Sequence, residues 1–150
     1  MKRLISTLIL TLASFNLSAG VDTGTDINDV ILAGHDTVAY HLKGRPVEGD
    51  PAITAVYEGA IYRFANTRHR DLFVADPAKY APAYGGYCAL GTSFGKKFDV
   101  DGKAFEVVNG RLYVNKNREI YQTWRKEIPA NIEKAEQHWP KIRDVDASKL

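Results

Sequence analysis

The stretch that decides the fold is VVNGRLYV, residues 107–114. Asn109 and Gly110 both accept positive φ, and such a pair between β-branched and aromatic runs is typical of a two-residue β-hairpin. A second stretch of this kind, Ile53 to Ala65, carries a Gly turn at Glu58-Gly59 and predicts a second hairpin. We expect strands throughout residues 97–117, with a further turn at Asp101-Gly102.

Helical patterns lie outside the two hairpins. Asn66 or Thr67 begins a predicted helix that runs through Val74. Near the C-terminus one apolar stripe has spacings of three and four and comprises Ile120, Trp124, Ile128, Ile132, Ala135 and Trp139. Pro129 lies inside this long helix and should kink or split it. The pattern predicts an α+β fold, a small single domain in which two β-hairpins pack with helices.

Length and composition fit this interpretation. The chain has 150 residues, of which 45% are hydrophobic and 25% charged, enough for one domain with its own core. These values exclude collagen-like, coiled-coil and low-complexity proteins, and also a polytopic membrane protein. We divide the chain into a signal peptide at 1–20, a loose lead-in at 21–33, a domain at 34–142 and a polar tail at 143–150.

The first twenty residues have the pattern of a secretory signal peptide. Lys2 and Arg3 precede a short apolar run, which ends in the small residues Ser18-Ala19-Gly20. We expect cleavage after Gly20, or alternatively after Ala19, and a periplasmic or secreted protein with no membrane span after cleavage. The alternative is an uncleaved amphipathic anchor.

The predicted cleavage also changes the charge balance. Removing the two basic residues of the signal peptide from the total of 20 leaves 18, which equals the 18 acidic residues. A mature chain without net charge offers no electrostatic footprint for nucleic acid. Nucleic acid is therefore not an expected partner.

Cys88 is the only cysteine and the residue with the most distinctive chemistry. A thiolate is a soft ligand suited to copper(I) or zinc, and it is a nucleophile when its pKa is lowered. Further ligands for a closed zinc site would have to be His or carboxylate. His35 and His41 flank Asp36 and form a candidate ligand cluster if their segment folds back. The alternative is a small buried thiol in a loop rich in Gly and Tyr.

Several motifs between Gly34 and Trp139 point to a known family. They are Gly34-His35-Asp36-Thr37-Val38-Ala39-Tyr40, Tyr57-Glu58-Gly59, Tyr62-Arg63-Phe64-Ala65, Arg70-Asp71-Leu72-Phe73, Asp76-Pro77-Ala78-Lys79-Tyr80-Ala81-Pro82, Tyr84-Gly85-Gly86-Tyr87-Cys88-Ala89, Gly110-Arg111-Leu112-Tyr113 and Ala135-Glu136-Gln137-His138-Trp139-Pro140. Together these motifs resemble the YHS domain family, in the longer secreted form found in bacteria. The resemblance covers most of the chain that follows the predicted signal peptide.

The resemblance implies a small metal-associated module. Cys-rich relatives that occur beside heavy-metal transport ATPases are thought to bind or sense copper and similar ions. Asp36 and Cys88 lie in the two clearest family motifs, and the resemblance therefore marks them as candidate site residues. This chain departs from the family in lacking the additional cysteines, in having Thr37 where Pro is usual, and in having His35 and His41 where aromatic residues are usual.

The first functional hypothesis is a periplasmic copper- or zinc-binding module that serves metal handling or sensing. Cys88 would be the thiolate ligand, and His35 or His41 would be imidazole ligands. Asp36 would be an oxygen ligand or would orient another ligand.

Two other hypotheses stay open. A non-metal binding module would take a small ligand or a periplasmic partner protein in an aromatic pocket, with Tyr40, Tyr84 and Tyr87 as its candidate residues. An enzyme would use Cys88 as a nucleophile activated by a His. The spacing places no such Cys–His pair, so an enzyme is the least favoured of the three hypotheses.

Overall fold

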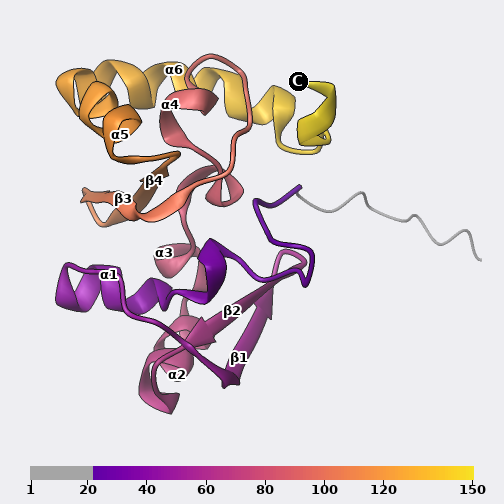
Figure 1. Ribbon diagram of the computed structural model, residues 1–150, viewed down its shortest axis with the longest axis vertical. Coiled ribbons are helices and arrows are strands. Elements are labelled where there is room, and N and C mark those ends of the chain that lie inside the picture. Colours follow the sequence, from indigo (N-terminus) through magenta and orange to yellow (C-terminus); the bar gives the residue numbers. More distant parts are fainter. Residues whose placement is uncertain (1–21) are drawn as a thin grey trace, which may run out of the picture.

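Two antiparallel β-hairpins, each packed with its own helices, divide the molecule into two lobes (Figure 1). The computed structural model describes residues 22–150, so the predicted signal peptide lies outside the described residues. The N-terminal lobe contains α1 (Thr37–Lys43), β1 (Asp50–Tyr57), β2 (Ala60–Phe64), α2 (Thr67–Ala75) and α3 (Pro77–Tyr80). The C-terminal lobe contains α4 (Ala89–Thr92), β3 (Asp101–Val108), β4 (Arg111–Asn115), α5 (Arg118–Trp124) and α6 (Ile128–Ile142). Short 3-10 turns occur at Leu32–Gly34, Ala83–Gly86, Arg125–Glu127 and Ala147–Lys149. The predicted α+β class is confirmed.

Both predicted hairpin turns are present, and each has two successive residues with positive φ. Glu58 and Gly59 have φ of 49° and 80°, and Asn109 and Gly110 have φ of 50° and 78°. These left-handed pairs match the right-handed twist of the strands that they join. The Glu58 turn therefore has the same backbone form as the more favourable Asn-Gly turn.

The predicted turn at Asp101-Gly102 is wrong, because both residues belong to β3. Asp101 pairs with Asn115 of β4, and the register then shifts before Phe105. Residues 97–100, which we expected in a strand, have irregular backbone. Gly102 is required by close packing, since a Cβ there would lie 2.8 Å from the Tyr40 hydroxyl oxygen. Tertiary contact thus accounts for a glycine that looked like a turn signal.

The long C-terminal helix is divided as the sequence predicts. It consists of α5, a 3-10 turn at Arg125–Glu127, and α6, with Pro129 in the first turn of α6. Proline is tolerated there because its missing N–H has no helical acceptor in any case. The Asn131 side chain donates to the Trp124 carbonyl at 2.9 Å and satisfies an acceptor at the break.

Strand β4 is shared by the two hydrophobic cores. Leu112 and Val114 belong to the core of the N-terminal lobe, with Val38, Tyr40, Phe64 and Phe73 among its other members. Tyr113 points to the second core, which includes Tyr84, Trp124 and Ala135. Alternation along a strand sends successive side chains to opposite faces. One strand therefore ties both lobes together.

The segment at 21–33 is not a loose lead-in over its last residues. Val30, Ile31 and Leu32 are all buried. The Ile31 amide donates to the Ile61 carbonyl at 3.1 Å, and the Ile61 amide donates to the Asp29 carbonyl at 2.7 Å. The segment thus adds a short parallel contact to the free edge of β2. The short apolar run of this segment has no strand periodicity, so this edge contact could not be predicted.

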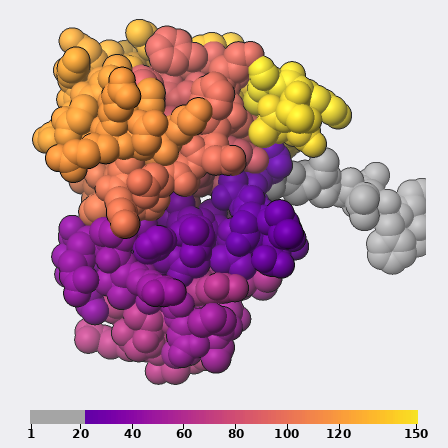
Figure 2. All heavy atoms as spheres, in the orientation of Figure 1, coloured from indigo at the N-terminus to yellow at the C-terminus, as the bar shows by residue number. Residues whose placement is uncertain are grey.

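A buried lysine connects the first described residues to the C-terminal tail. The side chain of Lys97 has no exposed surface, and its ammonium donates to Asp22 Oδ2 at 2.9 Å. It also donates to the carbonyls of Arg143 and Val145, at 3.1 and 2.6 Å. The yellow tail and the indigo start of the described chain consequently lie side by side (Figure 2). The predicted polar tail is therefore anchored at its beginning.

Among residues 22–150, no helix combines the length and the apolar character that a membrane crossing requires.

Replacing the buried ammonium tests this connection. Lys97→Met should lower the free energy of unfolding by about 2–4 kcal/mol, because Asp22 and two carbonyls lose their donor. Urea denaturation measures the change, with the exposed Lys103→Met as the control. A Lys97 variant as stable as the Lys103 variant would contradict the assignment.

Candidate functional site

The Asp36 carboxylate is completely buried and connects three elements of the N-terminal lobe. Its Oδ1 caps α1 by accepting the amides of Val38 and Ala39, at 3.0 and 3.2 Å. Its Oδ2 accepts the Ala65 amide at 2.9 Å and the Nδ1 of His69 at 2.6 Å. A carboxylate offers about four acceptor positions, and all of them are used here. Asp36 is therefore not free to bind a metal ion.

The two histidines that flank Asp36 point elsewhere. His35 Nδ1 is 2.8 Å from the Leu32 carbonyl and donates to it. The His41 ring contacts Tyr80 edge to face, with 5.3 Å between ring centroids. His41 Nε2 is buried and has no hydrogen-bond partner among the described residues. Burial lowers the pKa of His41, and the ammonium of Lys79 lowers it further.

Cys88 lies in the C-terminal lobe and is almost fully buried. Its thiol is 3.7 Å from Asn115 Oδ1, and its sulfur accepts the Gly91 amide at 3.5 Å. It borders a pocket of about 280 Å³ whose other lining residues are Leu90, Gly91, Phe94, Phe98, Lys116 and Ile120. This environment is that of a buried structural thiol.

The four predicted metal ligands do not gather in one place. Within residues 22–150, no three His, Cys, Asp or Glu side chains are arranged to hold one metal ion. The partners of Asp36 and those of Cys88 belong to different lobes, and the residues present do not fit a shared copper or zinc site. Metal binding stays a prediction from the sequence.

Two of the three predicted pocket tyrosines are internal contacts. Tyr40 is buried and donates its hydroxyl to the Gly102 carbonyl at 2.9 Å. Tyr87 is also buried and donates to Asp22 Oδ2 at 2.9 Å. Burial raises the pKa of both hydroxyls, so both remain protonated donors. Tyr84 is also buried, at 2% exposed, but it lies in the wall of an open cavity.

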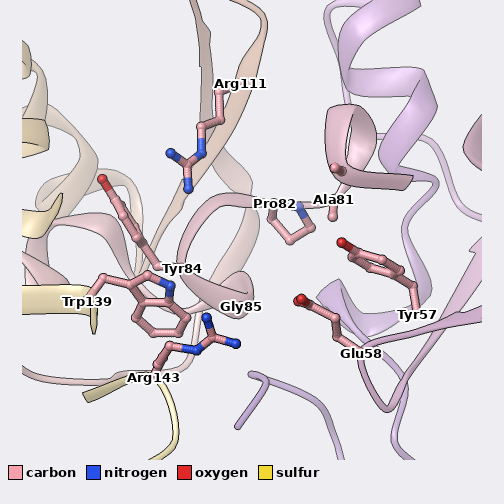
Figure 3. A pocket seen from close by; sticks show the side chains of 10 residues that line it. Tyr57, Glu58, Ala81, Pro82, Tyr84, Gly85, Arg111, Trp139 and Arg143 are labelled. Carbon is pink, nitrogen blue, oxygen red and sulfur yellow. The ribbon is translucent and has the colours of Figure 1, made fainter. Parts of the chain in front are cut away.

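That cavity, the interlobe cleft, has a volume of about 190 Å³ and is open to solvent (Figure 3). Its lining residues are Tyr57, Glu58, Ala78, Ala81, Pro82, Tyr84, Gly85, Arg111, Trp139 and Arg143. The β1–β2 turn and α3 of the N-terminal lobe supply one wall, and β4 and the end of α6 supply the other. The chain thus brings four distant segments to one cavity, residues 57–58, 78–85, 111 and 139–143.

The wall of the C-terminal lobe is built on Tyr84. Its hydroxyl donates to Glu136 Oε1 at 3.1 Å, and its ring centroid lies 5.9 Å from that of Trp139. The Arg111 guanidinium donates to the same Glu136 oxygen at 2.9 Å and lies 5.3 Å from the Tyr84 ring centroid. Burial and the Glu136 carboxylate raise the pKa of Tyr84. The wall therefore presents the partly exposed Trp139 ring and the Arg111 cation, with the buried Tyr84 ring behind them.

The opposite wall presents Tyr57 and Glu58, whose polar ends point into the cleft (Figure 3). Tyr57 is half-buried against Phe73, with ring centroids 6.1 Å apart. Partial burial and the Glu58 carboxylate raise the pKa of Tyr57. The cleft can accordingly hold a small polar molecule between hydrogen-bonding groups and aromatic rings.

Most of the cleft could not be predicted from the sequence. Glu58, Arg111 and Trp139 belong to three different sequence motifs, and their spacing does not predict that they lie together. Arg143 belongs to the predicted polar tail. His69 was also missed as the partner of Asp36, which lies 33 positions away. Contacts at such separations leave no periodic signal.

The structural role of Asp36 has a direct test. Asp36→Asn should lower the free energy of unfolding by about 2–4 kcal/mol, because an amide NH₂ would face N–H donors. Chemical denaturation measures the loss. Asp50→Asn is the matched control, since Asp50 is exposed and also accepts a local amide. A residue that served only as a metal ligand would leave stability unchanged, and that result would refute the connecting role.

The environment of His41 predicts a pH effect on stability. A histidine with a lowered pKa favours the neutral form in the folded state, so the unfolded state binds more protons. The stability that neutral His41 contributes is fully present above its ordinary pKa of about 6.5. It is lost as the pH falls from there through the lower pKa of His41 in the folded protein. Denaturation at pH 7 and pH 5 should show a smaller loss for His41→Phe than for the unmodified protein. Equal losses would show that His41 does not contribute.

Comparisons with family models, with curated proteins and with solved structures found no match to this chain. The resemblance to the YHS domain family therefore stays a prediction.

Proposed function

We propose that this protein is a binding module that takes a small organic ligand in the interlobe cleft. The observation that carries the proposal is the convergence of aromatic and charged side chains from both lobes on one open cavity (Figure 3). Ligand sites typically combine apolar walls with a few convergent polar groups. This is the non-metal hypothesis, with Tyr84 as the one predicted residue that takes part.

Backbone strain at the cleft supports the proposal. Glu58 and Tyr84 are non-glycine residues with positive φ, 49° and 56°, and both line the cavity. A left-handed conformation costs an ordinary residue about 1–2 kcal/mol. Strained backbone of this kind clusters at functional sites. Here the strained residues place the exposed Glu58 carboxylate at the cleft and the buried Tyr84 ring in its wall.

The cleft wall is also fixed from behind. The Gly24 amide donates to the Gly85 carbonyl at 2.8 Å, and the Asp22 amide donates to the Arg143 carbonyl at 3.0 Å. The Lys97 ammonium lies 5.4 Å from the Trp139 ring centroid on the inner side. A wall held in this way loses little conformational freedom when a ligand binds.

A steric block tests the proposal. Amide NMR spectra would be recorded during titration with a set of small carboxylates, amines and aromatic compounds. At least one compound should shift the amide signals of Glu58, Gly85 and Arg111 in a saturable manner. Ala78→Phe places a ring at the cleft and should abolish these shifts, because Ala78 is an exposed lining residue.

Ala75→Phe is the matched control, since Ala75 is exposed but does not line the cleft. It should leave the shifts intact. The proposal would be wrong if no compound in the set moved the cleft signals, or if the shifts persisted in the blocked variant.

A further inference from the structure

The charges of the interlobe cleft are separated across it. Arg111 and Arg143 belong to the C-terminal lobe, and Glu58 projects from the turn of the N-terminal lobe (Figure 3). Arg111 donates to Glu136 through Nη1, and Arg143 donates to Asp144 through Nε at 3.3 Å. Since a guanidinium has five N–H donors, both side chains keep several donors for a ligand.

Glu58 has no comparable partner. None of the ion pairs within residues 22–150 includes it. Its carboxylate nevertheless points toward the space that the arginines border (Figure 3). A purely anionic ligand would meet repulsion from Glu58, and a purely cationic ligand would meet repulsion from the arginines. A ligand that carries both charges satisfies both walls.

The second hairpin provides an internal comparison for Glu58. Both turns have the same left-handed backbone, but the β3–β4 turn uses Asn109 where the β1–β2 turn uses Glu58. Asn is the preferred residue at this position, and Glu is disfavoured. The backbone preference of this turn position therefore does not explain why Glu58 is present. The negative charge that Glu58 brings to the cleft does explain it.

The size and the rings of the cleft narrow the ligand further. A volume of about 190 Å³ is below the roughly 300 Å³ at which pockets for drug-sized ligands begin. Trp139 and Tyr57 line the cleft and are only partly buried, so their rings can pack against a flat side chain. A guanidinium binds a carboxylate through paired N–H donors. These features fit one small molecule with a carboxylate, an ammonium and an apolar group.

We infer that the cleft binds a free amino acid with an aromatic side chain. Its carboxylate would lie at Arg111 and Arg143 and its ammonium at Glu58. This inference rests on the proposed function and specifies its ligand class. No covalent step is involved.

Three matched probes test the inference by calorimetry or NMR titration at pH 7. Phenylalanine carries both charges, 3-phenylpropanoate lacks the ammonium, and phenylalaninamide lacks the carboxylate. Phenylalanine should bind about tenfold more tightly than either single-charge probe, because the loss of one charged contact weakens binding by about a factor of ten.

Two variants test which cleft residue contacts the ammonium of the ligand and which contacts its carboxylate. Glu58→Gln should weaken phenylalanine about tenfold and leave 3-phenylpropanoate unweakened. Arg143→Gln should weaken phenylalanine and 3-phenylpropanoate and leave phenylalaninamide unweakened. Glu133→Gln, at an exposed position of α6 outside the cleft lining, is the control and should change none of the three affinities.

The outcomes separate this inference from the proposed function. If 3-phenylpropanoate binds as tightly as phenylalanine and Glu58→Gln has no effect, the zwitterion inference is overturned and the cleft remains a binding site. If none of the three probes shifts the cleft amides, the inference is again overturned. The Ala78→Phe experiment then decides the proposed function independently, because it uses a wider set of compounds.

Discussion

The hydrogen bonds around the Asp36 carboxylate are the constraint on which the N-terminal lobe depends. They cap α1, hold the chain just after β2, and fix His69 of α2. A buried charge is stable only when its acceptor positions are filled, so these elements must assemble together. The β1–β2 hairpin is thereby oriented, and with it the turn that carries Glu58 to the cleft.

Strand β4 transmits this orientation to the other lobe. Leu112 packs into the core of the N-terminal lobe while its neighbour Tyr113 packs into the second core. Arg111 precedes them in the same strand, so its place at the cleft follows from the packing of both lobes. The cleft is therefore defined by the cores rather than by a flexible loop between separate units.

Local features were predictable from the sequence, and features that depend on distant contacts were not. The Asn109-Gly110 turn and the break near Pro129 follow from backbone preferences of the residues themselves. The same backbone preferences wrongly predicted a turn at Gly102, where the absence of a side chain instead allows close packing against Tyr40. At the cleft, Tyr84 was predictable as an aromatic candidate, whereas the opposition of Glu58 and Arg143 arises only when the two lobes meet.

The Lys97 contacts have a consequence for the order in which the fold can be completed. They join Asp22, near the start of the described chain, to carbonyls of Arg143 and Val145 near its end. Synthesis from the N-terminus supplies the two carbonyls only after residues 22–142 have been made. A nascent chain consequently cannot close this part of the structure, and the wall behind Trp139 forms after translation has passed Val145.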